Sequence, residues 1–385
     1  MNRTDSIIFY LLIIILSSLF AYFSQIKKEG TKYSTNKKQT NERKNYNILM
    51  IIISYIILTL PIALKYNTGA DYTSYMNIYG NVQMYGMNAS SVTNTEIGFI
   101  LLNYLCFKIF KDFQSVIIIA AVITNYFMYK AILYESKYIN LGLAIFTYGF
   151  TLYFLEYSII RNMLGISIGF YALRFIFERK PVKYFIFITI AVLFHNSLII
   201  FYMIGILYTE KLKKYRLHIG IISIILIPFI PNIINYSVKY ALMLSPNYSF
   251  YLKNINMSSF SYGISFLVYS LPLIPFMTFY KKMKVININL SLYFSLYIVS
   301  SVILLISYSN PIMMRLVYAL WTSQIILFPL LFSALGKING IYKKTILYGI
   351  SLSGFVIYGI IIILNIINTE LWYMIPYKSI LQKYF

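Results

Sequence analysis

One short stretch of this sequence brings together residue types that can move a proton and hold a charge. Lys65, Gly69 and Asp71 fall in the run KYNTGADYTSY, which has no other charged residue. A carboxylate in such a run suits general-base chemistry, and the glycine allows a ligand to approach the backbone closely. Tyr72 and Tyr75 follow, and a stretch so rich in tyrosine and poor in charge resembles a ligand groove more than a solvated connector. The alternative is that Lys65 and Asp71 form a salt bridge at a membrane surface.

Three further charged residues lie in or beside apolar runs, where an ionised group is costly unless it is paired or faces water. Glu96 opens such a run, so it is either a cap on the helix dipole or a second proton acceptor. Arg161 lies between two apolar segments, and its nearest acidic neighbour in the sequence is Glu156. Arg315 follows an Asn-Pro pair. Both guanidinium groups suit phosphate oxygens, and the alternative for each is a side chain that snorkels to the headgroups.

His195 lies in the middle of an apolar run and is one of only two histidines. It is a third candidate for proton transfer, and the alternative is a hydrogen-bonded packing residue. The second histidine, His218, lies in a basic segment and has no predicted role. No His, Cys and carboxylate cluster has the spacing of metal ligands, and Cys106 is the only cysteine. The sequence therefore predicts no metal site and no disulfide.

The composition shows what must position these residues. Of the 385 residues 59% are hydrophobic and only 11% are charged, whereas about 25% is usual for soluble domains. The mean hydropathy is +0.70, and apolar runs of membrane length recur along the whole chain. The net charge of +22 is scattered in short clusters between these runs, which is typical of membrane orientation and not of nucleic-acid binding. We therefore expect an all-α, polytopic membrane protein with a single transmembrane domain over residues 1–385.

About twelve transmembrane helices are expected, one of which can be broken or re-entrant. The first apolar run is followed by a basic loop without a cleavage pattern, so it is expected to be retained. That loop, 25–47, carries seven lysines and arginines against two glutamates, a net charge of +5, which places it in the cytoplasm. The expected spans are 6–24, 48–64, 97–111, 115–134, 140–158, 162–177, 184–208, 217–235, 264–280, 286–308, 315–335 and 345–367.

This topology places loops 65–95 and 236–263 and the tail 368–385 at the outer face. The aromatic and basic residues of the tail, Trp372, Pro376, Tyr377 and Lys378, predict an anchor at the membrane interface. One segment conflicts with the charge rule. Twelve full spans put the basic segment 178–183 outside, so a run between 97 and 208 is expected to be broken or re-entrant and to line a protein-bounded cavity.

The candidate residues, taken in order along the chain, resemble the EpsG family of Wzy-like bacterial polysaccharide polymerases. The matching pieces are 65–75, 96–103, 160–165, 191–198 and the Arg315 helix through Pro376 and Tyr377. Each motif is short, and their order and spacing together carry the resemblance. The chain departs from the family pattern at Lys65, usually Arg, and at Asn162, usually Gln. Lysine keeps the charge but loses the bidentate geometry of arginine, which affects the role expected at position 65.

The resemblance implies a polymerase in the bacterial cytoplasmic membrane that joins polyprenyl-diphosphate-linked oligosaccharide repeat units into a capsular, exopolysaccharide or O-antigen chain at the outer face. Asp71 is the first candidate for the base, with Glu96 and His195 behind it. Arg161 and Arg315, helped by Lys65, would stabilise the departing diphosphate. Tyr72 and Tyr75 would bind sugar. No metal or other cofactor is implied, and a single displacement would invert the anomeric carbon. The implied partners are the lipid-linked oligosaccharide, the growing polysaccharide, the bilayer and, beyond these, flippase and chain-length regulator proteins.

Two alternative functions fit the same residues. The first is a membrane glycosyltransferase that adds one sugar from a polyprenyl-phosphate donor. The second is a transporter or flippase for lipid-linked oligosaccharides, although the two halves of the chain show none of the similarity that transporter repeats produce. Accumulation of fully built lipid-linked repeat units after gene deletion would separate the polymerase from the single-sugar transferase.

Overall fold

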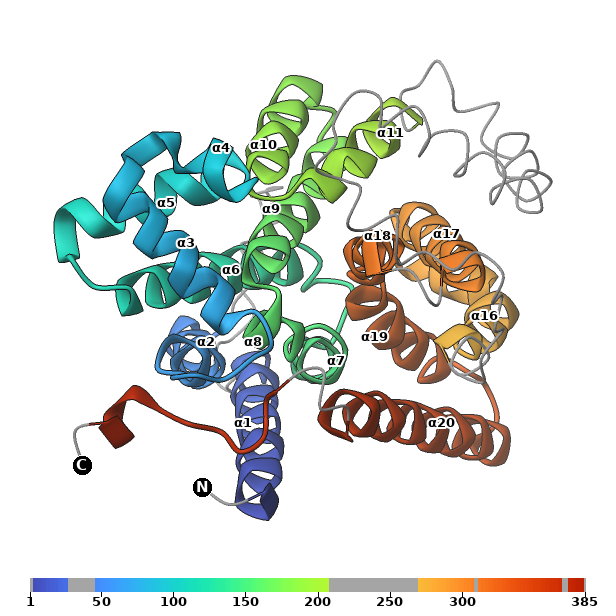
Figure 1. The fold of residues 1–385 in the computed structure, drawn as a ribbon. Helices are drawn as coiled ribbons and strands as arrows, with labels where there is room; N and C mark the ends of the chain where they lie inside the picture. Colours follow the sequence, from blue (N-terminus) through green and yellow to red (C-terminus); the bar gives the residue numbers. More distant parts are fainter. Residues whose placement is uncertain (1–2, 27–45, 208–268, 308–310, 369–372, 384–385) are drawn as a thin grey trace, which may run out of the picture.

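The computed structural model describes residues 3–26, 46–207, 269–307, 311–368 and 373–383 (Figure 1). Helices form nearly all of these segments, and the one extended pairing among them is an isolated bridge between Lys65 and Ser379. The all-α prediction is therefore confirmed. The expected span 217–235, the expected loop 236–263 and most of the basic loop 25–47 lie outside the described residues.

The first part of the chain forms helices of very different lengths. In order they are α1 Arg3–Ser24, α2 Ile48–Ala63, α3 Tyr72–Tyr85, η1 Gly86–Asn88, α4 Ala89–Thr93, α5 Ile97–Phe110, α6 Gln114–Tyr134, α7 Leu141–Thr151, α8 Leu155–Ser158, α9 Ile160–Phe177, α10 Pro181–Phe194, η2 Asn196–Ile199 and α11 Ile200–Leu207. The C-terminal part contributes α16 Leu273–Ile286, α17 Leu290–Ser307, α18 Pro311–Trp321, α19 Gln324–Leu335, α20 Ile341–Asn368 and η7 Ile380–Lys383.

Four of the described helices, α1, α6, α9 and α20, are long and apolar enough to cross a membrane. The bent pair formed by Met314–Trp321 and Gln324–Leu335 adds a fifth if it is one span. The expected number of about twelve is thus not confirmed. Polar contacts connect α2 with α1 and α6: the hydroxyl of Ser54 lies 2.9 Å from that of Ser17 and 2.8 Å from that of Tyr129. Such contacts hold helices together where the hydrophobic effect does not.

The helices of the N-terminal part have two distinguishable ends. At one end, Gln114 at the start of α6 donates to the carbonyl of Ala63 at the end of α2, at 2.7 Å. At the other, Asn47 before α2 donates its N–H to the carbonyl of Ser24 at the end of α1, at 2.9 Å. The rings of Tyr134 and Phe177 stack at 6.4 Å where α6 and α9 finish. We call these the Ala63 end and the Ser24 end.

Helix α5 differs from the expected span at 97–111, because it begins and ends at the Ala63 end. Glu96, just before α5, forms an ion pair with Arg161 at the start of α9, and Gln114, just after α5, contacts the end of α2. The 14 residues of α5 extend over about 21 Å, which fits this course. Figure 1 shows α3, α4 and α5 gathered beside α6 and α10.

The run expected as one helix over 184–208 is two helices separated by a turn. Helix α10 ends where His195 adopts extended backbone, with φ −158° and ψ 123°. Helix α11 then runs back along α10, so that the rings of Phe185 and Tyr202 stack at 5.9 Å and the hydroxyl of Tyr184 donates to the carbonyl of Phe201. This turn brings His195 to the start of α9.

Candidate active site

The ion pair between Arg161 and Glu96 forms the centre of the site. Nη1 of Arg161 lies 2.6 Å from Oε2 of Glu96, and the two side chains are 21% and 12% exposed. The other oxygen of Glu96 accepts from the backbone N–H of Asn196 at 3.3 Å. Glu96 therefore connects α5, α9 and the turn after α10. A guanidinium has five N–H donors, so pairing with one carboxylate leaves Arg161 capacity for a ligand.

Asp71 lies beside this ion pair. It precedes α3 and is half-buried, and Tyr75, one turn further on, hydrogen bonds to it and lies under the Arg161 guanidinium, 6.0 Å from ring centroid to Cζ. Burial raises the pKa of Asp71 above its ordinary value, although Arg315, Arg161, Tyr75 and Lys65 oppose this shift. A carboxylate with a raised pKa is a stronger proton acceptor, which is what a general base requires.

Arg315 reaches the same place from α18, which contacts α9 and η2. Of the groups that oppose the raised pKa of Asp71, Arg315 has the largest effect. Its guanidinium therefore lies near this carboxylate. Among the described residues no ion pair forms with Arg315, and its side chain is half-buried. Two arginines thus flank one carboxylate, and of these two only Arg161 forms an ion pair with an acidic side chain within the described part of the chain.

His195 completes the group in the turn between α10 and η2. Its Nδ1 accepts from the backbone N–H of Ser197 at 3.2 Å and lies 2.8 Å from the hydroxyl of the same residue. Burial lowers the pKa of His195 to about 3, and the charges of Arg315 and Arg161 lower it further. The ring is therefore neutral with its proton on Nε2, so it can donate a hydrogen bond. We call Asp71, Tyr75, Glu96, Arg161, His195 and Arg315 the Asp71 cluster.

A family model matches residues 47–379 of this chain, a range that includes every member of the Asp71 cluster. The chain belongs to the EpsG family. This is a family of Wzy-like polysaccharide polymerases, so the resemblance in the sequence motifs is confirmed. No curated protein and no solved structure matches the chain.

Lys65, the EpsG-motif residue expected to help bind diphosphate, is fully buried. Its amino group donates to the carbonyl oxygens of Glu156, at 3.2 Å, and Tyr157. Burial lowers the pKa of Lys65 to about 7, and the charges of Glu156 and Asp71 oppose the shift. Diphosphate binding by Lys65 stays a prediction, but its immediate partners are backbone atoms at the start of α9.

The two tyrosines expected to bind sugar are also buried, with Tyr72 5% and Tyr75 2% exposed. The Tyr72 ring packs edge-on against Phe113 at 5.5 Å, while Tyr75 packs against Phe99 at 5.4 Å. Neither ring offers a free face for stacking, so their sugar-binding role stays a prediction.

Sequence reasoning gave no role to two polar side chains that support the site. The amide of Asn162 donates to the hydroxyl of Ser197 at 3.0 Å, which ties the start of α9 to the turn at His195. Their positions in the sequence could have indicated this role, because Asn162 follows Arg161 directly and Ser197 lies two residues after His195. As for metals, the described residues contain no group of three or more His, Cys, Asp or Glu side chains that could hold an ion.

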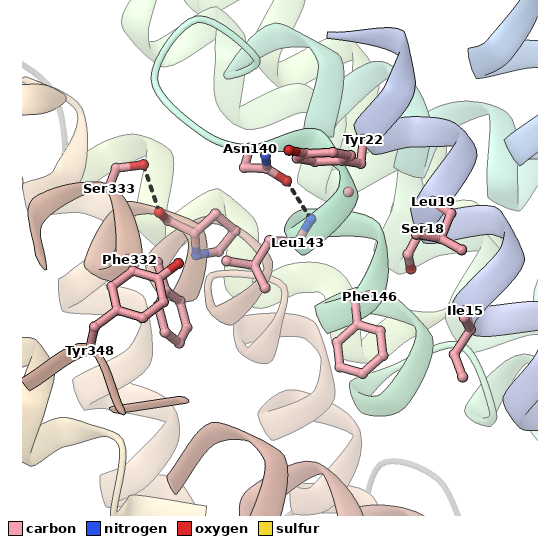
Figure 2. A pocket seen from close by; sticks show the side chains of 12 residues that line it. Ile15, Ser18, Leu19, Tyr22, Asn140, Leu143, Phe146, Phe332, Ser333 and Tyr348 are labelled. Atoms are coloured by element: carbon pink, nitrogen blue, oxygen red, sulfur yellow. Dashed lines mark hydrogen bonds between the residues drawn. The ribbon is translucent and has the colours of Figure 1, made fainter. Parts of the chain in front are cut away.

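A separate cavity of about 500 Å³ opens between α1, α7, α19 and α20 (Figure 2). Its lining is mostly apolar and carries no charged side chain. Asn140, which caps α7 by accepting from Leu143 at 2.9 Å, marks its position towards the Ser24 end. None of its lining residues belongs to the Asp71 cluster. It is lined by Ile15, Ser18, Leu19, Tyr22, Asn140, Gly142, Leu143, Phe146, Pro329, Phe332, Ser333 and Tyr348.

Proposed function

We propose that this EpsG-family protein joins polyprenyl-diphosphate-linked oligosaccharide repeat units into a surface polysaccharide at the outer face of the bacterial cytoplasmic membrane. The observation that carries the proposal is the position of Asp71, a carboxylate with a raised pKa, beside Arg161 and Arg315. Glycosyl transfer from a lipid diphosphate needs these two functions together, a base for the acceptor and cations for the leaving group.

In the proposed reaction Asp71 takes the proton of an acceptor hydroxyl. The hydroxyl oxygen then attacks the anomeric carbon of the donor repeat unit, and the bond between that carbon and the diphosphate oxygen breaks. The leaving diphosphate keeps the electron pair of this bond, and a single displacement of this kind inverts the anomeric configuration. The growing chain and the bilayer-bound lipid take part in this step. Flippase and chain-length regulator proteins are further proposed partners that do not take part in the reaction itself.

The two arginines have different surroundings and so different proposed parts. Arg315 forms no ion pair within the described segments, which suits direct contact with the diphosphate. Arg161 is oriented by Glu96 and adds a second cation. Since both oxygens of Glu96 are engaged, we assign it a positioning role ahead of proton transfer. Neutral His195 would donate from Nε2 to a sugar or diphosphate oxygen.

The test uses purified wild type and Asp71→Asn, reconstituted with lipid-linked repeat units at several concentrations. The maximal rate of Asp71→Asn should fall by about two to four orders of magnitude, the usual contribution of a general base. Asp112→Asn is a matched control, because Asp112 is an exposed carboxylate in the loop between α5 and α6. A maximal rate for Asp71→Asn within a few-fold of wild type would remove Asp71 as the base, and Glu96 and His195 would then be tested in the same assay.

The pH profile gives an independent check. A base must be ionised, so the wild-type rate should fall as the pH decreases through the pKa of Asp71. Because burial raises this pKa, the fall should begin at a higher pH than for a free aspartate. Asp71→Asn should lose this acid limb and Asp112→Asn should keep it. An unchanged acid limb in Asp71→Asn would assign the ionisation to another group.

A further inference from the structure

We propose that the C-terminal segment Tyr373–Lys383 positions Asp71, because it holds the segment Leu64–Gly69 against the start of α9. This inference rests on the proposed function, in which Asp71 is the base. Figure 1 shows the C-terminal segment passing beside α1 and α2 and ending away from α20, the helix that precedes it in the sequence.

The backbone of the segment 64–69 forms three hydrogen bonds with the backbone of the C-terminal segment. The N–H of Tyr66 donates to the carbonyl of Lys378, and the N–H of Ile380 donates to the carbonyl of Leu64, both at 2.8 Å. These bonds flank the bridge between Lys65 and Ser379. Three residues further on, the N–H of Gly69 donates to the carbonyl of Tyr373 at 2.9 Å. The two segments thus form a short antiparallel pair.

Tyr377 fixes the C-terminal segment to the helix bundle. Its ring is 5% exposed and packs against Phe9 at 4.9 Å. Its hydroxyl donates to the carbonyl of Pro61 and its N–H to the hydroxyl of Ser6, both at 3.0 Å. A side chain buried with its hydroxyl bonded cannot leave without exposing these groups, so the position of the segment is specific.

The opposite side of the segment 64–69 is held by the residues before α9. Lys65 donates to the carbonyls of Glu156 and Tyr157, and the N–H of Ala70 donates to the hydroxyl of Ser158 at 3.2 Å. Gly69 has a φ of +100°, and a Cβ there would lie 1.9 Å from the carbonyl oxygen of Tyr157. The chain before Asp71 is therefore enclosed between the C-terminal segment and α8.

This enclosure fixes Asp71 relative to Arg161. Asp71 follows Ala70 directly, and Arg161 follows Ser158 by three residues. The hydrogen bond between Ala70 and Ser158 therefore links the chain just before the base to the chain just before the cation. If the C-terminal segment were released, the segment 64–69 would be held only by the residues before α9. Displacement of a reacting group by about 1 Å can cost on the order of 10²-fold in rate.

The experiment compares Tyr377→Ala and Tyr377→Phe with Leu381→Ala in full-length protein. Leu381 is 52% exposed on the same segment, so it is the matched control. Backbone hydrogen exchange at Tyr66 and Gly69 should become at least about tenfold faster in Tyr377→Ala, while exchange in α6 and α9 stays unchanged. The maximal polymerisation rate should fall about 10- to 100-fold, with a smaller change in KM.

Tyr377→Phe keeps the ring and removes only the hydroxyl, so it should fold and show an intermediate effect in both measurements. Wild-type exchange at Tyr66 and Gly69 in Tyr377→Ala would overturn the inference, as would faster exchange there with an unchanged rate. Absence of polymerisation by the wild-type protein would instead contradict the proposed function, and the exchange data would still test whether the C-terminal segment holds residues 64–69.

Discussion

Two regions with ionisable side chains lie next to each other at the Ala63 end. They differ in how many of their hydrogen-bonding groups already have partners within the protein. In the buried region, Lys65 is fully buried and Glu156 is 1% exposed. The two oxygens of Glu156 accept from Asn125 at 3.3 and 3.2 Å, and Tyr148 donates to one of them at 3.2 Å. In the Asp71 cluster, by contrast, Arg161 keeps 21% of its side chain exposed.

The difference shows that a charged residue near an apolar run can serve two purposes. A buried ionisable group is tolerated only where hydrogen bonds replace water, and Lys65 and Glu156 meet that condition with groups of the protein itself. Arg161 and Arg315 are half-buried and keep donors that a negatively charged ligand can use. We therefore expect substitutions in the buried region to act on folding and substitutions in the Asp71 cluster to act on catalysis.

Among substitutions of the basic residues, the largest effect is expected from Arg161→Lys. Lysine keeps the charge but loses the planar fork, so the maximal polymerisation rate should fall about 10²- to 10³-fold while the protein stays folded in the membrane. Arg174→Lys is the matched control, since Arg174 lies on the same helix and pairs with Glu178 at 3.1 Å towards the Ser24 end. Normal polymer from both Arg161→Ala and Arg315→Ala would remove these arginines from the mechanism.

A smaller effect of a different kind is expected at Lys65. Lys65→Met leaves the carbonyls of Glu156 and Tyr157 without their donor, which should destabilise the protein by roughly 1–3 kcal/mol. Thermal unfolding in detergent measures this loss, and activity should fall along with the folded fraction. Lys65→Arg can still donate to both carbonyls and should retain more activity than Lys65→Met. Full stability of Lys65→Met, combined with a large loss of rate, would favour the predicted role of Lys65 in diphosphate binding.

The sequence predicted much of the Asp71 cluster but not its connections. Asp71, Glu96, Arg161, His195 and Arg315 were selected because polar groups in apolar runs are costly, and the structure brings all five together. The ion pair between Glu96 and Arg161 was hidden, because Glu156 is nearer to Arg161 in the sequence. Contacts between distant segments have no local pattern, so one sequence does not reveal them.

The all-helical fold was also predictable, because apolar runs of this length have no other arrangement in lipid. The course of α5 was not, because an apolar run of 14 residues fits a short span and a surface helix equally well. The role of the C-terminal segment was hidden for a related reason. Its aromatic residues predicted an interface anchor, whereas Tyr377 is 5% exposed and packs against α1.

The last prediction concerns which face of the membrane each end of the bundle occupies. With α5 at the Ala63 end, α6 and α9 both run from that end towards the Ser24 end, so the basic segment 178–183 lies opposite Asp71. If the Ala63 end faces outwards, 178–183 faces the cytoplasm. The conflict with the charge rule in the twelve-span topology then disappears.

Cysteine labelling tests this topology with little expected effect on activity. Cys106, the only natural cysteine, is 1% exposed, so background labelling should be low. Ser74 and Lys183 are both exposed and lie at the Ala63 end and the Ser24 end. An impermeant thiol reagent should label Ser74→Cys in intact cells but should label Lys183→Cys only after permeabilisation. Labelling of both variants in intact cells would mean that α5 crosses the membrane after all, and the reverse pattern would invert the orientation and place the Asp71 cluster on the cytoplasmic side.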